Sequence, residues 1–268
     1  MPPSPLEKPG YRLEFHDEFD GPRLDTARWL PFYLPQWSSR ARSAPNYVFE
    51  EGCLVFQITA EQSPWCPEFD GENRCSCVQT GVFSGPLGSA IGQSRFNERV
   101  RVRGAQAPAR TYTPQYGYFE LRARGTGSPN SHVALWMIGY EDQPERSAEI
   151  CICEIMGAHV SPSSSRVGYG VHRWYDPAMT EEFYQDFFGL DAARFHIYAA
   201  EWRPEHIDFY IDRQKVRTVR QSPRYPMQFM LGMFEVPRPG AARDPAEFPK
   251  RFAVDYFRAY QPVEGYRG

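Results

Sequence analysis

Glu149 and Glu154 are the residues whose type and spacing point most directly to chemistry. They lie in AEICICEIMG, residues 148–157, an apolar segment of Ile and Cys. Carboxylates are rare in such surroundings unless they are paired or functional. Two carboxyl groups about 5 Å apart form the reactive pair of retaining glycosidases, in which one attacks the sugar and the other transfers a proton. The alternative to a catalytic pair is an ordinary strand in which one glutamate forms a salt bridge and the other is solvated.

The position of Glu154 depends on a β-bulge. In a regular strand side chains alternate, so that Glu149, Cys151 and Cys153 share one face and Glu154 lies on the other. One extra residue near Ile152 or Cys153 returns Glu154 to the face of Glu149. The two Cα atoms are then about 13 Å apart, and carboxyl groups that lean inward approach to about 5 Å. We therefore predict a bulge in this strand if the two glutamates act together.

Most of the chain consists of short segments of alternating polarity separated by Gly, Pro, Asn and Ser. In YGYFELRAR (116–124), for example, Tyr118, Glu120 and Arg122 share one face. The segments predicted to be strands are 52–60, 116–124, 132–139, 149–155, 195–202, 206–213, 228–234 and 252–260. Residues 181–189 are expected to form one or two helical turns.

The fold expected from this pattern is all-β, with two packed antiparallel sheets in a single domain over residues 1–268. The 25 Pro and 21 Gly favour many turns and few long helices. The chain has no βαβ alternation, internal repeat or low-complexity linker. An aromatic content of 15% suits either a large sandwich core or a surface that stacks on ring-shaped ligands.

The overall charge argues against two classes of partner. A net charge of −3 gives no electrostatic basis for binding nucleic acid or an anionic membrane. The longest apolar runs are too short to span a bilayer. The N-terminal residues have no charged start followed by an apolar stretch, so we expect a cytoplasmic protein if the chain is complete.

The six cysteines are expected to be free thiols, because the chain is long and has no recognisable leader. Cys66, Cys75 and Cys77 cluster in WCPEFDGENRCSC, which could hold a loop disulfide or a metal ion. Their spacing matches no paired C-x-x-C zinc site. The alternative is three small residues below a surface loop.

Several segments resemble, in the same order, those of glycoside hydrolase family 16. EICICE resembles the family signature E-[aliphatic]-D-[aliphatic]-x-E, and residues 195–216 are similar to its segment H-x-Y-x-x-x-W-x-P-x-x-I-x-F-Y-x-D. Further similar segments are FHDEFDGPRLDTARW (15–29), YGYFELRARGTG (116–127), VALW (133–136), YPMQFMLGMFE (225–235) and FAVDYFRAYQ (252–261). The resemblance covers about residues 11–261.

This resemblance implies a jelly-roll sandwich with a concave substrate cleft. It also implies hydrolysis, with retention, of an internal β-linkage in a glucan or galactan. We expect a monomer that cleaves β-1,3 or mixed β-1,3/1,4 linkages of a glucan. Glu149 is then the nucleophile and Glu154 the general acid/base, which the apolar Ile150, Ile152 and Ile155 would help to keep protonated. The alternative is a lectin-like carbohydrate-binding protein on the same fold, inactive because its catalytic strand has changed. Members of the family are usually secreted.

Two residues depart from the family pattern. Cys151 replaces the middle Asp of the signature, and a thiol is a weak donor that stays neutral between two carboxylates. Our hypothesis is that Glu154 then titrates lower than it would beside an Asp, and that the pH optimum shifts to the acid side. His132 occupies a position where many members have an aromatic residue, so it either alters a sugar subsite or is an ordinary loop histidine.

Other positions match residues that contact sugar in the family. Glu120 and Arg122 are expected to meet sugar hydroxyls in the cleft, the alternative being a surface ion pair. Trp136 is expected on the cleft floor, where a flat ring stacks on a sugar face, or else in the core. The same resemblance assigns cleft contacts to His172, Trp174, Trp202, Asn46 and Gln228, with the core as an alternative for Trp202.

The resemblance also implies one structural calcium ion on the convex side. Asp255 would hold it, together with backbone oxygens near Glu18 and Gly52, since oxygen ligands suit a hard cation. No redox or nucleotide cofactor is expected, because the chain has no Gly-rich phosphate-binding loop.

Overall fold

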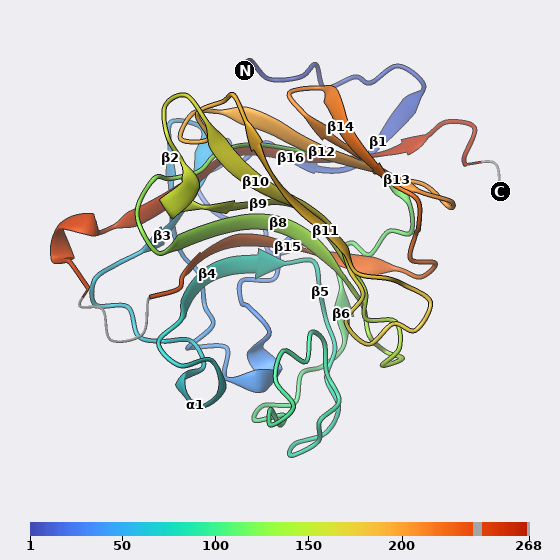
Figure 1. Cartoon of the computed structure of the whole chain (residues 1–268). Coiled ribbons are helices and arrows are strands. Elements are labelled where there is room, and N and C mark those ends of the chain that lie inside the picture. The colour runs from blue at the N-terminus through green and yellow to red at the C-terminus, as the bar shows by residue number, and fades with distance from the viewer. Residues whose placement is uncertain (238–242, 267–268) are drawn as a thin grey trace.

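Two large antiparallel sheets make up most of the structure, a computed structural model that describes residues 1–237 and 243–266 (Figure 1). The eight-stranded sheet has the order β14 (Gln214–Val219), β13 (Ile207–Ile211), β12 (His196–Trp202), β7 (Gly117–Arg124), β16 (Lys250–Pro262), β3 (Cys53–Ile58) and β2 (Asn46–Glu50), and β1 (Tyr11–Asp17) also pairs with β16. The six-stranded sheet has the order β11 (Glu182–Phe188), β10 (Ser165–His172), β9 (Glu149–Met156), β8 (Ser131–Gly139), β15 (Met227–Glu235) and β4 (Arg74–Gln79).

The remaining elements are short. β5 (Gly81–Val82) and β6 (Ala109–Arg110) form a two-stranded sheet. The helical segments are α1 (Pro67–Asp70) and the 3-10 turns η1 (Pro35–Trp37), η2 (Gly157–His159) and η3 (Pro245–Glu247). No helix in the described part of the chain is long and apolar enough to cross a membrane.

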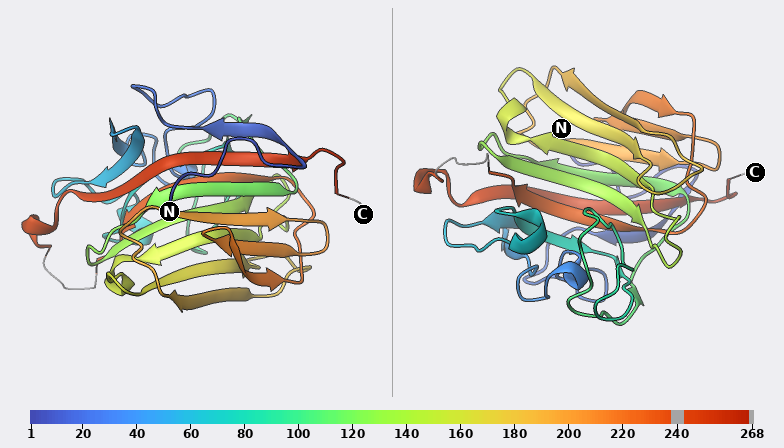
Figure 2. Two further views of the ribbon diagram at one scale, coloured as in Figure 1. Left: turned by 90° about the horizontal axis from the view of Figure 1, so that it is seen from above. Right: turned by 60° about the horizontal axis from the view of Figure 1, so that its bottom comes forward.

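The main hydrophobic core lies between the two large sheets, which form two layers (Figure 2). Phe119 and Leu121 of β7 and Leu135 and Met137 of β8 are fully buried in one cluster that contains residues of both sheets. Because side chains alternate along a strand, these core residues leave their chain neighbours on the outer faces of the sandwich.

The outer face of the six-stranded sheet is concave and partly covered. Trp136 and Met230 of this sheet pack in a second apolar cluster with Trp37, Trp65 and Val102 from the long connections. The segments that carry η1 and α1, and the loop between β5 and β6, lie on this concave side (Figure 1). They fill one part of the concave face and leave a groove along β8 and β9.

The all-β sandwich predicted from the sequence is confirmed, and the eight predicted strands correspond to β3, β7, β8, β9, β12, β13, β15 and β16. The expected helical turns at residues 181–189 are wrong, because this segment forms β11 at the edge of the six-stranded sheet. Its pairing with β10 outweighs the local pattern, in which large side chains are spread along both faces of the strand.

Gly170 of β10 packs beside β9 and provides a test of this geometry. It lies opposite Cys151 of β9, its φ is +137°, and a Cβ there would lie 2.3 Å from the carbonyl oxygen of Glu182. We expect Gly170→Ala to lower the free energy of unfolding by about 1–3 kcal/mol, measured by denaturant unfolding. Gly189→Ala is the control, because no atom lies within 4 Å of its Cβ position, and it should change stability by less than about 0.5 kcal/mol. Equal stability of the two variants would contradict this account.

Candidate active site

The bulge predicted in β9 is present. On the β8 side, Cys153 pairs with Leu135 and Cys151 pairs with Trp136, so that Ile152 is the extra residue. The ladder between β9 and β10 shifts at the same place. Ile152 and Cys153 both point into the core between the sheets. The alternation is thereby reset, and Glu154 lies on the outer face.

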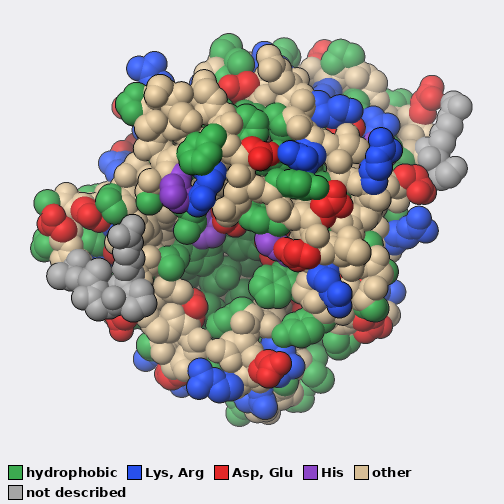
Figure 3. All heavy atoms as spheres, viewed as in Figure 1, with side chains coloured by type: hydrophobic (Ala, Val, Ile, Leu, Met, Phe, Trp, Pro, Cys, Tyr) green, Lys and Arg blue, Asp and Glu red, His purple; other side chains and the backbone are tan. Residues whose placement is uncertain are grey.

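Glu149, Cys151 and Glu154 therefore line one groove on the concave face, with a volume of ≈ 240 Å³. Aromatic side chains form much of its wall, from Tyr33, Phe96, Trp136, Trp174 and Phe234. Figure 3 shows this face hollowed, with mostly hydrophobic side chains inside the hollow and histidine and acidic side chains at its edge. Flat rings beside paired carboxyl groups suit a sugar chain, whose faces are apolar and whose rim is hydroxylated.

Glu149 is fixed by the residues that follow β10. Trp174 Nε1 donates a hydrogen bond to Glu149 Oε2 at 2.9 Å, and His172 lies opposite Glu149 in the β9–β10 ladder. Burial raises the pKa of Glu149, whereas His172 and the Trp174 hydrogen bond oppose that rise. The carboxyl is thus held in one place but is reluctant to ionise before substrate arrives.

The pKa of Glu154 is shifted in the opposite direction to that of Glu149, and His132 on β8 contributes to this shift. His132 Nε2 lies 3.5 Å from Glu154 Oε2, and both side chains are about four-fifths buried. Burial alone would raise the pKa of Glu154, but His132, with smaller contributions from His172 and Arg166, brings it below its ordinary value. The expectation that isoleucine neighbours keep Glu154 protonated is therefore wrong, because His132, His172 and Arg166 together outweigh the effect of burial on its pKa.

Cys151 lies between the two carboxyl groups on the groove face and is 1% exposed. Burial, followed by the charges of Glu154 and Glu149, raises the pKa of this thiol well above its ordinary value. The position that carries an Asp in the family signature therefore carries a neutral group here, as the sequence suggested.

Of the other predicted sugar-contact residues, Trp136 and Trp174 line the groove. His172 lies beside it, stacked on Phe183 with ring centres 4.3 Å apart. Gln228 is completely buried below the loop that carries Gln93, whose Nε2 donates to Gln228 Oε1 at 2.6 Å.

The structure does not bring the remaining four residues to the groove. Glu120 and Arg122 of β7 lie on the outer face of the eight-stranded sheet, where Glu120 accepts hydrogen bonds from two tyrosines and Arg122 pairs with Asp255 at 2.7 Å. Trp202 is fully buried in the core between the sheets. Asn46 begins β2, and its backbone exchanges hydrogen bonds with Ser76.

The calcium site stays a prediction, and the structure gives the present partners of the residues expected to hold it. Two nitrogens of Arg258 donate to the Glu18 carboxylate at 2.9 and 2.6 Å. Arg122 Nη1 donates a hydrogen bond to Asp255 Oδ2 at 2.7 Å. Gly52 forms the turn between β2 and β3 with a φ of +70°. No group of three or more His, Cys, Asp or Glu within residues 1–237 and 243–266 is arranged to hold a metal ion.

The cysteine cluster is built of buried free thiols. Cys66 Sγ donates to the carbonyl of Trp37 at 3.4 Å, and Cys77 Sγ donates to the carbonyl of Met233 at 3.6 Å. Cys66, Cys75 and Cys77 belong to the apolar cluster that supports the concave face, which agrees with the alternative of small residues below a loop.

Several groove residues were not identified from the sequence. They are Tyr33, Asn73, Ser94, Phe96, Phe234 and Val236. Phe234 could have been found, since it lies in a predicted strand on the same face as Gln228. The others lie in loops, where no periodic pattern marks the side chains that face a ligand.

The contact between His132 and Glu154 makes a testable prediction. We expect His132→Phe to raise the pKa of Glu154, because the cation that favours its ionised form is lost while the burial that disfavours ionisation remains. The measurement is a ¹³C NMR titration of glutamate carboxyl carbons, with Glu154→Gln to assign the signal. His206→Phe is the control, because His206 contacts Asp208 on the other sheet. An unchanged or lower pKa of Glu154 in His132→Phe would refute the assignment.

Comparison with known proteins identifies the family. The sequence pattern described as "Glycosyl hydrolases family 16" matches residues 100–256. A beta-glucanase of Acetivibrio thermocellus is 31% identical over 123 residues, which are 44% of this chain and 34% of that protein. A beta-glucanase of Rhodothermus marinus is 25% identical over 179 residues, covering 56% of this chain and 58% of that protein. The matches thus cover between about a third and three fifths of the length of these curated relatives.

Solved structures agree with this assignment. The GlcNAcα1-4Gal releasing endo-β-galactosidase from Clostridium perfringens is 33% identical, with a TM-score of 0.86 over 100% of this chain and 67% of that chain. A laminarinase from Flavobacterium sp. UMI-01 shares the fold at 22% identity and a TM-score of 0.64, over 93% of this chain and 100% of that one. Because the family pattern matches more than half of the chain, residues 100–256, the chain belongs to glycosyl hydrolase family 16.

Proposed function

We propose that the protein is an endo-acting β-glycosidase that cleaves an internal β-linkage with retention of anomeric configuration. The observation that carries this proposal is the placement of Glu149 and Glu154 in one groove by the bulge at Ile152. A double displacement needs two carboxyl groups on one face of the sugar-binding site. Their separation of about 5 Å, expected for retention, stays a prediction.

In this proposal Glu149 is the nucleophile. Its carboxylate attacks the anomeric carbon as the bond from that carbon to the leaving oxygen breaks, which forms a covalent glycosyl ester. The hydrogen bond from Trp174 Nε1 keeps Oε2 in position and lowers the cost of ionising a buried carboxyl. Loss of the remaining water when a sugar binds would strengthen this hydrogen bond.

Glu154 is the general acid in the first step and the general base in the second. It gives a proton to the leaving oxygen, and it later removes one from the water that hydrolyses the ester. His132 Nε2 lies 3.5 Å from Glu154 Oε2 and is therefore placed to position this carboxyl beside the leaving oxygen.

The substrate we infer is a β-glucan, as in the sequence prediction and as the names of the curated relatives suggest. A second candidate is a glycan with an internal β-galactoside bond. It is favoured by the whole-chain similarity to the endo-β-galactosidase, whose TM-score of 0.86 exceeds the 0.64 of the Flavobacterium laminarinase. Aromatic groove walls stack on either sugar, so the test has to be chemical.

The deciding experiment is a product profile on laminarin, lichenan, galactans and glycans that end in GlcNAcα1-4Gal. We expect internal cleavage of one class, with ¹H NMR showing β-configured products at first release. Initial α-products would exclude the retaining mechanism. Binding without cleavage of any of these glycans would favour the lectin-like alternative.

Glu149→Ala tests the nucleophile. We expect kcat to fall by at least about a thousandfold, because no other carboxylate in the groove replaces the lost ester bond. With an activated substrate, added azide should restore turnover and give an α-glycosyl azide, since the small anion attacks from the vacated side. In Glu154→Ala the azide product should be the β-anomer, because the ester still forms on Glu149. Normal hydrolysis by Glu149→Ala, or the same anomer from both variants, would disprove the assigned roles.

Cys151→Asp tests the effect of the missing middle carboxylate. A new negative charge beside Glu154 disfavours its ionised form, so the pKa of Glu154 should rise. The acid form then persists to higher pH, and the alkaline limb of kcat/KM should move up by about one pH unit. Cys151→Asn, which adds bulk without charge, is the control. An unchanged or lower optimum in Cys151→Asp would contradict the hypothesis.

A further inference from the structure

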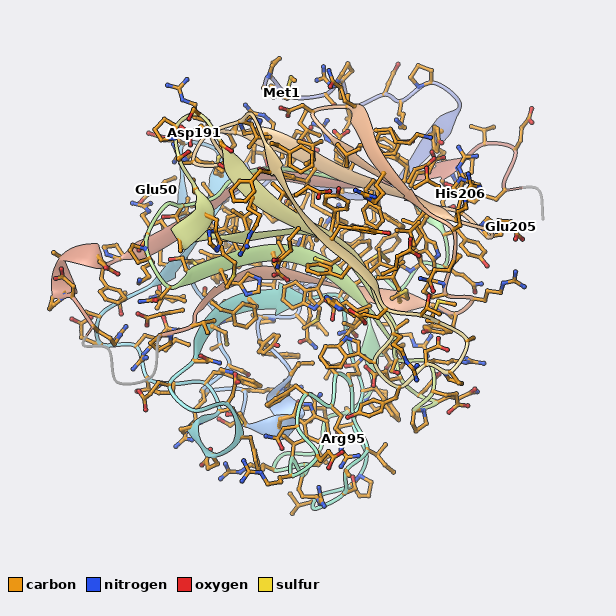
Figure 4. All side chains as sticks on the ribbon, in the orientation of Figure 1. Met1, Glu50, Arg95, Asp191, Glu205 and His206 are labelled. Carbon is orange, nitrogen blue, oxygen red and sulfur yellow. The ribbon has the colours of Figure 1, made fainter. Side chains whose placement is uncertain are left out.

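A second cavity lies directly beside the groove. It has a volume of ≈ 450 Å³ and is lined by Ala90, Ile91, Gly92, Arg95, Glu141, Pro144, Glu145 and Tyr175, which we call the side pocket. Arg95 lies in the loop region below the concave sheet (Figure 4). Neither the sequence resemblance nor the two glutamates requires this cavity.

Consecutive residues place the groove and the side pocket on two sides of one wall. Ser94 lines the groove and Arg95 the side pocket, and Trp174 lines the groove and Tyr175 the side pocket. Tyr175 OH also donates to the carbonyl of Arg95 at 3.4 Å, which ties the two segments together. Because Trp174 holds Glu149, this wall adjoins the nucleophile.

The backbone of this wall is strained. Ser94, Glu141 and Trp174 have φ values of 46°, 57° and 45°, a left-handed region that costs non-glycine residues of order 1–3 kcal/mol each. Ser94 N donates to Glu141 Oε1 at 2.6 Å, so two of the three strained residues hold each other. Strained backbone of this kind concentrates at ligand-binding and active sites.

The side chains of the side pocket combine apolar surface with polar groups. Ile91 and Tyr175 in the pocket are 46% and 50% exposed, and the adjacent Trp174 of the groove is 44% exposed, which is unusual for large apolar residues. Arg95 Nη2 donates to the carbonyl of Glu98 at 2.6 Å, which holds the guanidinium beside the cavity. Glu141 is 5% exposed, and its hydrogen bond from Ser94 leaves Oε2 for a ligand.

The side pocket offers polar groups that can both donate and accept hydrogen bonds. Burial raises the pKa of Glu141 well above its ordinary value, the backbone hydrogen bond from Ser94 opposes that rise, and the charge of Glu149 adds to it. Glu141 lies with Arg95 and Glu145 around the same cavity. A hydroxylated ring can use all three groups, because its hydroxyls both donate and accept hydrogen bonds.

We propose that the side pocket is a sugar-binding subsite that takes one additional sugar unit of the substrate, with Tyr175 stacking on the ring and Arg95 and Glu141 bonding to its polar groups. The inference rests on the proposed function, because it extends the substrate from the groove. It assigns selectivity for chain length or branching to the loops around Arg95 and Glu141 and not to the catalytic strand.

The test compares wild type, Tyr175→Ala and Leu87→Ala on a ladder of oligosaccharides of the class that the product profile identifies. Leu87 is the matched control, because it is 72% exposed in a neighbouring loop segment but does not line the side pocket. We expect Tyr175→Ala to lose about tenfold in kcat/KM on the longer or branched members and to match wild type on the shortest one cleaved. Arg95→Ala should show the same dependence on length.

Two outcomes would overturn the proposal that the side pocket binds sugar. Equal activity of Tyr175→Ala and wild type at every length means that no sugar reaches it. Equal loss at every length means that Tyr175 acts only by positioning Trp174. If wild type cleaves nothing, calorimetric titration of laminari-oligosaccharides and N-acetyllactosamine oligosaccharides tests whether the side pocket binds sugar. A subsite there gives binding that Tyr175→Ala weakens and Leu87→Ala does not. If no binding is measured either, both the proposed subsite and the proposed glycosidase function are wrong.

Discussion

One extra residue in β9 is the constraint on which the site depends. Ile152 and Cys153 both point into the core, so the strand presents Glu149, Cys151 and Glu154 on the same side. Without this shift, Glu154 would face the core between the sheets, and burying an unpaired carboxylate there costs several kcal/mol. The apolar residues around the glutamates thus do two things. They anchor the strand to the core, and they make the bulge the arrangement in which both carboxyl groups reach the groove.

The two departures from the family signature act on the same proton. Replacing a middle carboxylate by the neutral Cys151 removes a charge that would favour protonation of Glu154, and placing His132 at 3.5 Å adds one that disfavours it. Both therefore push Glu154 toward its ionised form, against the effect of burial. The ionisation of Glu154, on which the proposed acid step depends, is thus governed by these two positions together with burial.

Sequence pattern was sufficient for the sandwich, because period-two alternation is a local property, whereas the bulge was predicted from the requirement that the two glutamates act on one face. Sequence pattern was insufficient to predict which sheet a strand joins and which side of that sheet its polar residues occupy. Glu120 and Arg122 share a face as predicted, but that face is on the eight-stranded sheet and points away from the groove. The strand β11 was missed for a related reason, since its conformation is fixed by pairing with β10 and not by its own residues. Loop residues such as Ser94 and Glu141 carry no periodic signal at all, although their long-range contact forms a wall of the site.

What separates the proposed catalytic carboxyl groups from the structural ones is how many of their oxygens already accept hydrogen bonds. Glu120 accepts from Tyr118 and Tyr256, and Glu18 accepts two hydrogen bonds from one arginine, so these carboxylates have little capacity left for a metal ion or a sugar. Glu149 has one donor, Trp174 Nε1, and Glu154 has an imidazole that contacts only one of its oxygens, while both line an open groove. Burying a carboxyl group whose oxygens accept no hydrogen bonds lowers the stability of the fold, because the lost hydration is not replaced. A bound ligand can supply the missing hydrogen bonds. Glu141 meets the same criterion in the side pocket, which is why we place the next contact of the substrate there.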